Sequence, residues 1–218
     1  ENNFLETIRE ICSKNSVPLI FDEISSGFRI CPGGSHLKFG VNPDLAVFAK
    51  AMGNGFPISC VLGKQDFMKT VEDSFVSSTN WTERVGSAAA IATIDKFIDK
   101  KVHLHLHKMG KSVQLFWKEM EHKYSLGIEV SGLYQLSYLS FKKHNDLKKT
   151  FFIEQMLKKS ILTTNRYYPN FAQKNSHLSE YKEAAEKVFK AMSKLKTKRQ
   201  LENKIRGTVS RPGFRRYA

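Results

Sequence analysis

The chain has 218 residues, of which 41% are hydrophobic, and a formal net charge of +14. This apolar content excludes wholesale disorder, and no apolar run reaches the length of a membrane-spanning helix. Eight Lys or Arg and one Glu fall in residues 196–218, so +7 of the +14 belongs to this basic end. We interpret it as a solvated segment and expect no nucleic-acid partner, because no helix-turn-helix or aromatic RNA-binding pattern accompanies it. Binding to DNA or RNA is the alternative.

The first residues and the cysteines bear on the cellular compartment. Residues 1–10 contain no Met and lack the layout of a signal peptide, so we interpret them as the inside of a longer chain. Cys12, Cys31 and Cys60 are widely spaced and form no CxxC pair. This predicts neither a zinc site nor a disulfide framework, and a reducing cytoplasm is the simplest location.

The first part of the chain has the pattern of an α/β sheet with short connections. Residues 3–15 place apolar side chains at helical spacing. Three short apolar runs, residues 17–23, 43–50 and 58–63, predict buried strands of a parallel sheet. Residues 25–36 are rich in Ser, Gly and Pro and predict a loop.

From Gly86 the pattern changes to that of a smaller α+β domain. The sequence is rich in Ala and helical in period as far as residue 124. Residues 128–141 alternate apolar and polar side chains as strands do, and residues 146–162 and 178–196 predict amphipathic helices. We therefore expect two regions of different architecture.

Three alternating histidines, His103, His105 and His107, raise the question of a metal site. They fall in a stretch with helical flanks, where positions i, i+2 and i+4 do not share one face. We therefore interpret them as solvated helix residues and expect no metal.

Two ionisable residues stand where predicted strands meet loops. Asp22 ends the first apolar run, and Lys50 follows the second, directly before a loop with Gly53 and Gly55. Open α/β sheets bind ligands at the carboxyl ends of their strands. A lysine beside apolar residues loses solvation of its charged form, which frees the amine to attack a carbonyl. Each residue alone also fits an ordinary role, Asp22 as a helix cap or ion-pair partner and Lys50 as an exposed lysine.

Taken as a pair, Asp22 and Lys50 match what pyridoxal phosphate chemistry needs. A carboxylate keeps the pyridine nitrogen protonated, so that the ring withdraws electrons. A lysine holds the aldehyde carbon as an imine and later moves a proton. Both groups must come from neighbouring strand ends for one ring to touch both.

The stretch 19–68, "LIFDEISSGFR…GGSHLKFGVNPDLAVFAKAMGNGFPISCVLGKQDFM", closely resembles the class III (fold type I) pyridoxal-phosphate aminotransferases, and most closely the branch with glutamate-1-semialdehyde aminomutase. The resemblance runs through nearly the whole chain and includes its ending, residues 207–218. It implies an α/β fold in which residues 1–109 are part of the large cofactor-binding domain, with a parallel or mixed sheet. Residues 110–218 would form the small C-terminal α+β domain.

The resemblance also implies roles for single residues. Asp22 would pair with the pyridine nitrogen of pyridoxal 5′-phosphate, Ile24 would pack on one face of the ring, and Lys50 would form the internal aldimine. A threonine within residues 77–90 would bind the cofactor phosphate in the neighbouring subunit, which implies a homodimer with shared active sites. Thr79 is the first choice for this residue and Thr82 the second.

The implied activity is transfer of an amino group from an amino acid donor to an aldehyde or ketone acceptor, with a sugar or another specialised metabolite as one option. Two alternatives stay open, an aminomutase of the glutamate-1-semialdehyde type and a catalytically incomplete fragment. The segment "ERVGSAAA" (83–90) stands where the aminomutase has a "GNP"-like signature, which favours a transaminase. The family's chains are about twice this length, and the missing half would carry the phosphate-holding turn and the aromatic residue that stacks on the ring.

Overall fold

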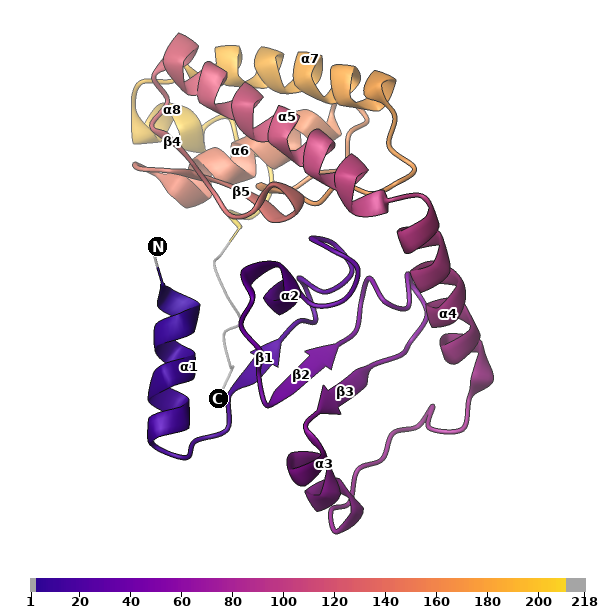
Figure 1. Cartoon of the computed structure of the whole chain (residues 1–218). Coiled ribbons are helices and arrows are strands. Elements are labelled where there is room, and N and C mark those ends of the chain that lie inside the picture. The colour runs from indigo at the N-terminus through magenta and orange to yellow at the C-terminus, as the bar shows by residue number, and fades with distance from the viewer. Residues whose placement is uncertain (1–2, 211–218) are drawn as a thin grey trace. The chain divides into compact units, whose positions relative to one another are not determined.

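The computed structural model describes residues 3–210, and the chain divides into two compact units, Glu1–His105 and Leu106–Ala218 (Figure 1). Residues 211–218, which hold most of the ending used for the family resemblance, lie outside the described residues. That the chain forms two compact units does not test whether residues 1–109 belong to the large cofactor-binding domain and residues 110–218 to the small one. That assignment stays a prediction.

The first unit is built around a three-stranded sheet. Its elements are α1 (Phe4–Lys14), β1 (Ile20–Asp22), α2 (Ser35–Phe39), β2 (Leu45–Phe48), β3 (Cys60–Gly63), α3 (Gln65–Glu72) and α4 (Arg84–Asp99). The sheet order is β1-β2-β3, with β1 parallel to β2 and β3 antiparallel to β2. The helix, strand and loop positions expected from the sequence are therefore confirmed for this unit.

The expected parallel arrangement is right for β1 and β2 but wrong for β2 and β3. A parallel neighbour needs a crossover connection, usually a helix. Residues 49–59 instead turn back through a loop in which Gly55 adopts a φ of +104°. This turn brings Cys60 opposite Phe48 in an antiparallel register.

The core of the first unit lies on one face of β2. Ala46 and Phe48 point to this face and are buried together with Met52 and with Ala90 of α4. The alternation that buries Ala46 and Phe48 leaves Leu45 and Val47 on the opposite face, where each is only half buried. The sheet is thus covered well on one side only.

A buried carboxylate fastens α1 and β3 to the strands. Asp44 is 4% exposed and accepts hydrogen bonds from Arg9 Nη1 at 2.8 Å, Leu19 N at 2.8 Å and Lys64 Nζ at 2.7 Å. The Leu19 N–H, with Lys64 and Arg9, holds the pKa of the Asp44 carboxyl well below its usual range. Three separate segments of the unit therefore meet at one charge.

The second unit is an antiparallel sheet covered by helices. Its elements are α5 (Val102–Tyr124), which begins just before the unit boundary, β4 (Ile128–Ser131), a 3-10 turn η1 (Tyr134–Leu136), β5 (Ser137–Phe141), α6 (Asn145–Leu157), β6 (Arg166–Tyr167), α7 (Asn175–Met192) and α8 (Lys198–Glu202). The sheet order is β4-β5-β6. This confirms the expected strands and helices, except that the helical stretch from residue 86 to 124 is two helices, broken where Lys101 has a φ of +48°.

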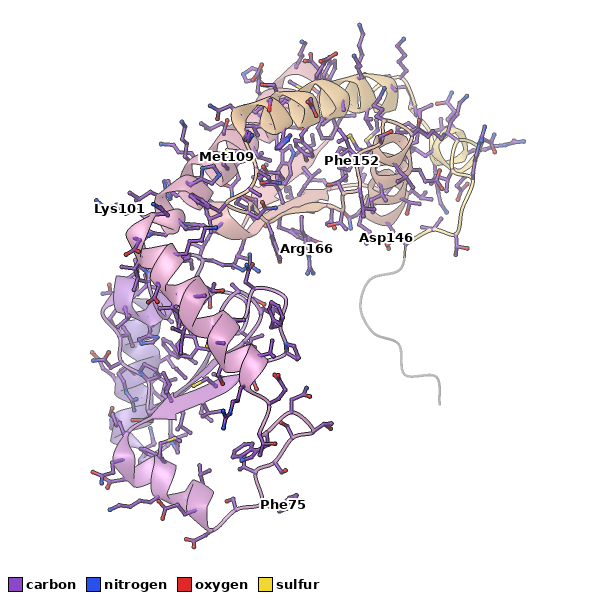
Figure 2. The ribbon with its side chains drawn as sticks, turned by 90° about the vertical axis from the view of Figure 1, so that its right-hand side faces the viewer. Phe75, Lys101, Met109, Asp146, Phe152 and Arg166 are labelled. Atoms are coloured by element: carbon purple, nitrogen blue, oxygen red, sulfur yellow. The ribbon has the colours of Figure 1, made fainter. Side chains whose placement is uncertain are left out.

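Aromatic side chains form the core of the second unit. Trp117, Leu139, Phe152 and Phe189 are fully buried, and Figure 2 shows Phe152 among the side chains inside this unit. The rings of Phe152 and Phe189 stack with centroids 5.2 Å apart. Trp117 Nε1 donates a hydrogen bond of 3.1 Å to the Tyr181 hydroxyl, so its one polar atom is satisfied. In residues 3–210, no helix has both the length and the apolar composition to cross a membrane.

We predict that Asp44→Asn destabilises the protein, because it removes the charge that Arg9 and Lys64 share and leaves a buried amide facing two cations. The free energy of unfolding should fall by about 2 kcal/mol, the usual worth of hydrogen bonds to a charged group. Urea denaturation measures this. Asp95→Asn, an exposed position on α4, should cost far less, and equal losses for the two variants would contradict the prediction.

Candidate active site

Asp22 and Lys50 lie at the same edge of the sheet in the first unit. Asp22 is the last residue of β1 and pairs in register with Val47 of β2. Lys50 comes two residues after the end of β2. Because β1 and β2 are adjacent and parallel, their carboxyl ends meet at this edge, as the sequence predicted.

Asp22 keeps one carboxylate oxygen available. Its Oδ1 accepts a hydrogen bond of 3.0 Å from the Ile24 N–H, which closes a tight turn after the strand. Its Oδ2 accepts no hydrogen bond from the described residues. Asp22 is exposed. Ile24, which follows it, is half buried.

Lys50 is held by a neutral neighbour. Its backbone has a left-handed φ of +46°, and its Nζ donates a hydrogen bond of 2.6 Å to Ser25 Oγ. The side chain is exposed, so the desolvation expected from its apolar neighbours is absent. The physical reason is that β2 buries Phe48 on the face toward α4, whereas nothing among the described residues covers Lys50 beyond the strand end.

The glycines after Lys50 serve the loop itself. A Cβ at Gly53 would lie 2.5 Å from the Phe56 carbonyl oxygen and 2.5 Å from Ile58, so only glycine fits. Asn54 and Gly55 both adopt positive φ angles. The loop is therefore tightly folded without a ligand, and close approach to a cofactor is not needed to explain these glycines.

Glu23 is a buried acid that anchors the loop after β1. It is 1% exposed, and its carboxylate accepts hydrogen bonds from the Ser26 hydroxyl, from Ser35 Oγ at 2.8 Å and from the His36 N–H at 3.0 Å. His36 Nδ1 lies 3.1 Å from the same carboxylate. Burial alone would raise the pKa of Glu23, but these hydrogen bonds outweigh it and lower the pKa to about 2.

Strand alternation is the signal in the sequence that finds Glu23. Because neighbouring side chains of a strand point to opposite faces, Glu23 turns inward where Asp22 turns outward. The two acids therefore face opposite ways, with Glu23 buried and Asp22 exposed. The anchoring role was missed, because Ser35 and His36 reach Glu23 only through the tertiary fold.

Thr79 and Thr82 lie apart from the other predicted residues. Both are exposed in the connection between α3 and α4, and neither makes a hydrogen bond to Asp22, Ile24 or Lys50 within the described chain. Two large apolar side chains of the same connection, Phe75 and Trp81, are 99% and 66% exposed. Figure 2 labels Phe75 on this connection. The end of the connection is closed by Glu83, whose carboxylate accepts hydrogen bonds from the first N–H groups of α4.

The described residues also line cavities that include neither Asp22 nor Lys50. An apolar cavity of about 610 Å³ in the first unit is lined by Phe28, Phe48 and Leu62 among others, but not by Asp22 or Lys50. A more polar cavity of about 370 Å³ in the second unit is lined by Tyr167 and Tyr168, with polar neighbours Arg166, Gln173, His177 and Glu180.

The two tyrosines differ in burial. Tyr167 is buried and donates a hydrogen bond of 3.1 Å to Gln173, and burial raises its pKa to about 12. Tyr168 is 41% exposed. Both tyrosines line the cavity in the second unit.

The histidines of residues 103–107 are not solvated as expected. Each is half buried. The His103 ring stacks on Phe97 with centroids 5.8 Å apart, and the His107 ring meets Tyr134 edge-on at 4.8 Å. In residues 3–210, no group of three or more His, Cys, Asp or Glu side chains is arranged to hold a metal ion.

Comparisons with known proteins add to this geometry. Residues 1–200 match the family described as Aminotransferase class-III. A 3-aminobutyryl-CoA aminotransferase of Cloacimonas acidaminovorans is 38% identical over 146 residues, which are 64% of this chain and 34% of that protein. A glutamate-1-semialdehyde 2,1-aminomutase of Clostridium beijerinckii is 30% identical over 82% of this chain and 42% of its own length.

The fold also resembles a solved structure. The structure of the PLP internal aldimine form of the Sphingopyxis sp. MTA144 FumI protein matches 89% of this chain with a TM-score of 0.82 and 24% identity. At this identity the likeness is evidence of the fold alone, and it confirms the expected α/β fold class. The match covers 48% of that chain, so this chain spans about half the length of its relatives or less.

We predict that Glu23→Gln makes stability less dependent on pH. The folded pKa of about 2 lies below the ordinary value of 4.5, so the contribution of Glu23 is complete above about pH 4.5 and is lost as the pH falls toward 2. The full contribution is on the order of 3 kcal/mol. Urea denaturation across this pH range should show a shallower loss in Glu23→Gln than in the wild type. Glu72→Gln, at an exposed site, should follow the wild-type curve, and coincident curves for all three proteins would contradict the prediction.

Proposed function

The chain belongs to the class-III aminotransferase family, and we propose that it acts in amino-group transfer from an amino acid donor to an aldehyde or ketone acceptor, with pyridoxal 5′-phosphate as the cofactor. The observation that carries this proposal is the meeting of Asp22 and Lys50 at the carboxyl edge of parallel strands β1 and β2. These are the acid and the amine that such a cofactor requires. The protein as a whole is the subject of this proposal, since the chain spans about half the length of its relatives or less.

The described residues fit the cofactor by their chemistry. When bound, it supplies an aldehyde carbon and an electron-withdrawing ring. Asp22 Oδ2 accepts no hydrogen bond from the described residues and suits a ring N–H donor, and Lys50 offers a primary amine at the same sheet edge. Ile24 presents a half-buried apolar side chain next to Asp22.

Each of the two ionisable residues then has one task. Asp22 would accept a hydrogen bond from the ring N–H and stabilise a positive charge on the ring nitrogen. Lys50 would hold the cofactor through its Nζ, and the same amine would move protons as a general base and acid. Its Nζ takes a proton from the donor's Cα and returns one during transfer to the acceptor.

A homodimer with shared sites is part of the proposal. Thr79, with Thr82 as the second choice, makes no hydrogen bond to Asp22, Ile24 or Lys50 within the described chain and would bind the cofactor phosphate of the partner subunit. The exposed Phe75 and Trp81 beside it support this, because large apolar side chains that gather on a surface are typical of protein contacts. The partners that we propose are therefore a second copy and small molecules, rather than nucleic acid.

An aminomutase is the second candidate. It is favoured by the relative from Clostridium beijerinckii, whose match covers 82% of this chain. In such an enzyme the donor and the acceptor are the same molecule. Turnover of an amino aldehyde without a second substrate would identify it, whereas a transaminase needs both a donor and an acceptor.

A catalytically incomplete piece is the third candidate. Asp22 and Lys50 are both exposed, and the strands beside them leave apolar side chains uncovered, with Ile20 at 56% and Leu62 at 57% exposure. A further part of the fold, as the longer relatives have, would cover such surfaces.

We also propose a reducing, cytoplasmic location, because Cys12, Cys31 and Cys60 are free thiols.

We predict that pyridoxal phosphate attaches to Lys50. Absorbance of the purified protein should change when the cofactor is added, and borohydride should fix the cofactor on the peptide that contains Lys50. Lys50→Ala should lose the attachment and lower the transfer rate about 10²- to 10⁴-fold. Lys69→Ala, an exposed lysine on α3, should behave as the wild type. Attachment to another lysine would refute the proposal, and no attachment to the wild type would support the incomplete piece.

We predict that Thr79→Ala weakens cofactor binding about tenfold, the effect of one hydrogen bond to a charged phosphate. Mixing Thr79→Ala with Lys50→Ala, at a cofactor concentration too low to load Thr79→Ala alone, tests whether the sites are shared. If Thr79 serves the partner subunit, each mixed dimer has one complete site, so about a quarter of the wild-type activity should return. No recovery would place the threonine in its own subunit's site, and the same experiment with Thr82→Ala decides between the two threonines.

A further inference from the structure

We propose that Ser25 holds the reacting amine of Lys50 and thereby controls its reactivity. The inference rests on the proposed function, in which Lys50 is the reacting lysine. It names a residue that the sequence pattern did not single out, one that contacts the reacting nitrogen directly.

The contact is short and joins distant parts of the chain. Lys50 Nζ donates to Ser25 Oγ at 2.6 Å, across 25 residues of sequence. Lys50 forms no ion pair within the described residues, although Asp22 and Glu23 both lie close to Ser25 in the sequence. Ser25 is therefore the group that fixes the position of the amine at the strand end.

A hydroxyl partner suits an amine that must change its charge. A carboxylate accepts hydrogen bonds only, so it would favour the charged form of lysine and oppose the loss of its proton. A serine hydroxyl both donates and accepts. It can accept from the ammonium group and donate to the neutral amine, so Ser25 can hold Lys50 Nζ in both states.

Ser25 is itself held on both sides. Before it, the Glu23 N–H donates to the Val47 carbonyl at 2.9 Å, which continues the pairing of β1 with β2. After it, the Gly27 N–H donates to the Glu23 carbonyl at 2.8 Å. A Cβ at Gly27 would lie 2.6 Å from the Phe48 ring, so the loop packs tightly there. The position of the Ser25 hydroxyl is therefore set before any ligand arrives.

The two neighbouring serines have different partners, which provides a matched control. The Ser26 hydroxyl donates to the buried Glu23 carboxylate, whereas the Ser25 hydroxyl accepts from Lys50. Removing either hydroxyl deletes the same atom from the same loop. Only the loss of the Ser25 hydroxyl removes a direct partner of the lysine amine.

The first measurement does not need the cofactor. Acetic anhydride labels amines according to their free lone pairs, and mass spectrometry reports the rate at Lys50 against pH. We expect Ser25→Ala to raise this rate about fivefold, the change that one ordinary hydrogen bond corresponds to. Ser25→Thr keeps the hydroxyl and should restore the wild-type rate and pH profile. Ser26→Ala weakens the Glu23 anchor of the same loop but removes no partner of the amine, so it should change the rate at Lys50 much less than Ser25→Ala does.

The second measurement follows attachment of pyridoxal phosphate to Lys50, fixed by borohydride at successive times. Here Ser25→Ala should be slower, by about fivefold, because the amine is free but no longer positioned. Faster labelling by acetic anhydride together with slower attachment of pyridoxal phosphate would show that Ser25 positions the amine. A lysine that had only become more exposed would react faster with both reagents. Circular dichroism checks that each variant is folded.

The outcomes separate this inference from the proposed function. Unchanged labelling of Lys50 in Ser25→Ala would overturn the inference, as would an equal effect of Ser26→Ala. If labelling responds to Ser25 but pyridoxal phosphate attaches to Lys50 in no variant, the contact stands and its role in catalysis is overturned with the proposed function. If wild-type attachment proceeds and Ser25→Ala attaches at the same rate, only the inference fails.

Discussion

The parallel pairing of β1 with β2 is the constraint on which the candidate site depends. Two parallel neighbours end at the same edge, so the register of Asp22 with Val47 brings an acid and an amine together from positions 28 residues apart. A slip of this register by one residue would turn Asp22 inward and Glu23 outward. The whole arrangement of the loop after β1 would then be lost.

The acids at residues 22 and 23 have different roles, because neighbouring side chains of a strand point to opposite faces. The outward carboxylate of Asp22 remains available for a ligand, and the inward carboxylate of Glu23 binds Ser26, Ser35 and His36. A buried carboxylate is costly unless hydrogen bonds replace its water. Because Glu23 has such bonds, its burial stabilises the turn that also carries Ser25 to Lys50. Catalytic geometry and loop stability therefore share the same few residues.

The exposure of the site agrees with the length of the chain. Asp22 and Lys50 face solvent, and the sheet beside them is packed well on only one face. The chain spans about half the length of the relatives that it matches, or less. The second unit differs in this respect, because its aromatic core of Trp117, Phe152 and Phe189 is completely closed.

The sequence by itself determined the element types and the two ionisable strand ends. Those depend on local periodicity and on the positions of Asp22 and Lys50, which are properties of short stretches. Tertiary structure alone decided that β3 runs antiparallel, that Asp22 and Lys50 are exposed, and that the histidines at 103–107 are half buried. It also decided which side chains Glu23 and Ser25 meet. The physical reason is that strand direction, burial and long-range hydrogen bonds depend on what packs against a residue. The periodicity of one segment does not predict which other segments contact it in the folded protein.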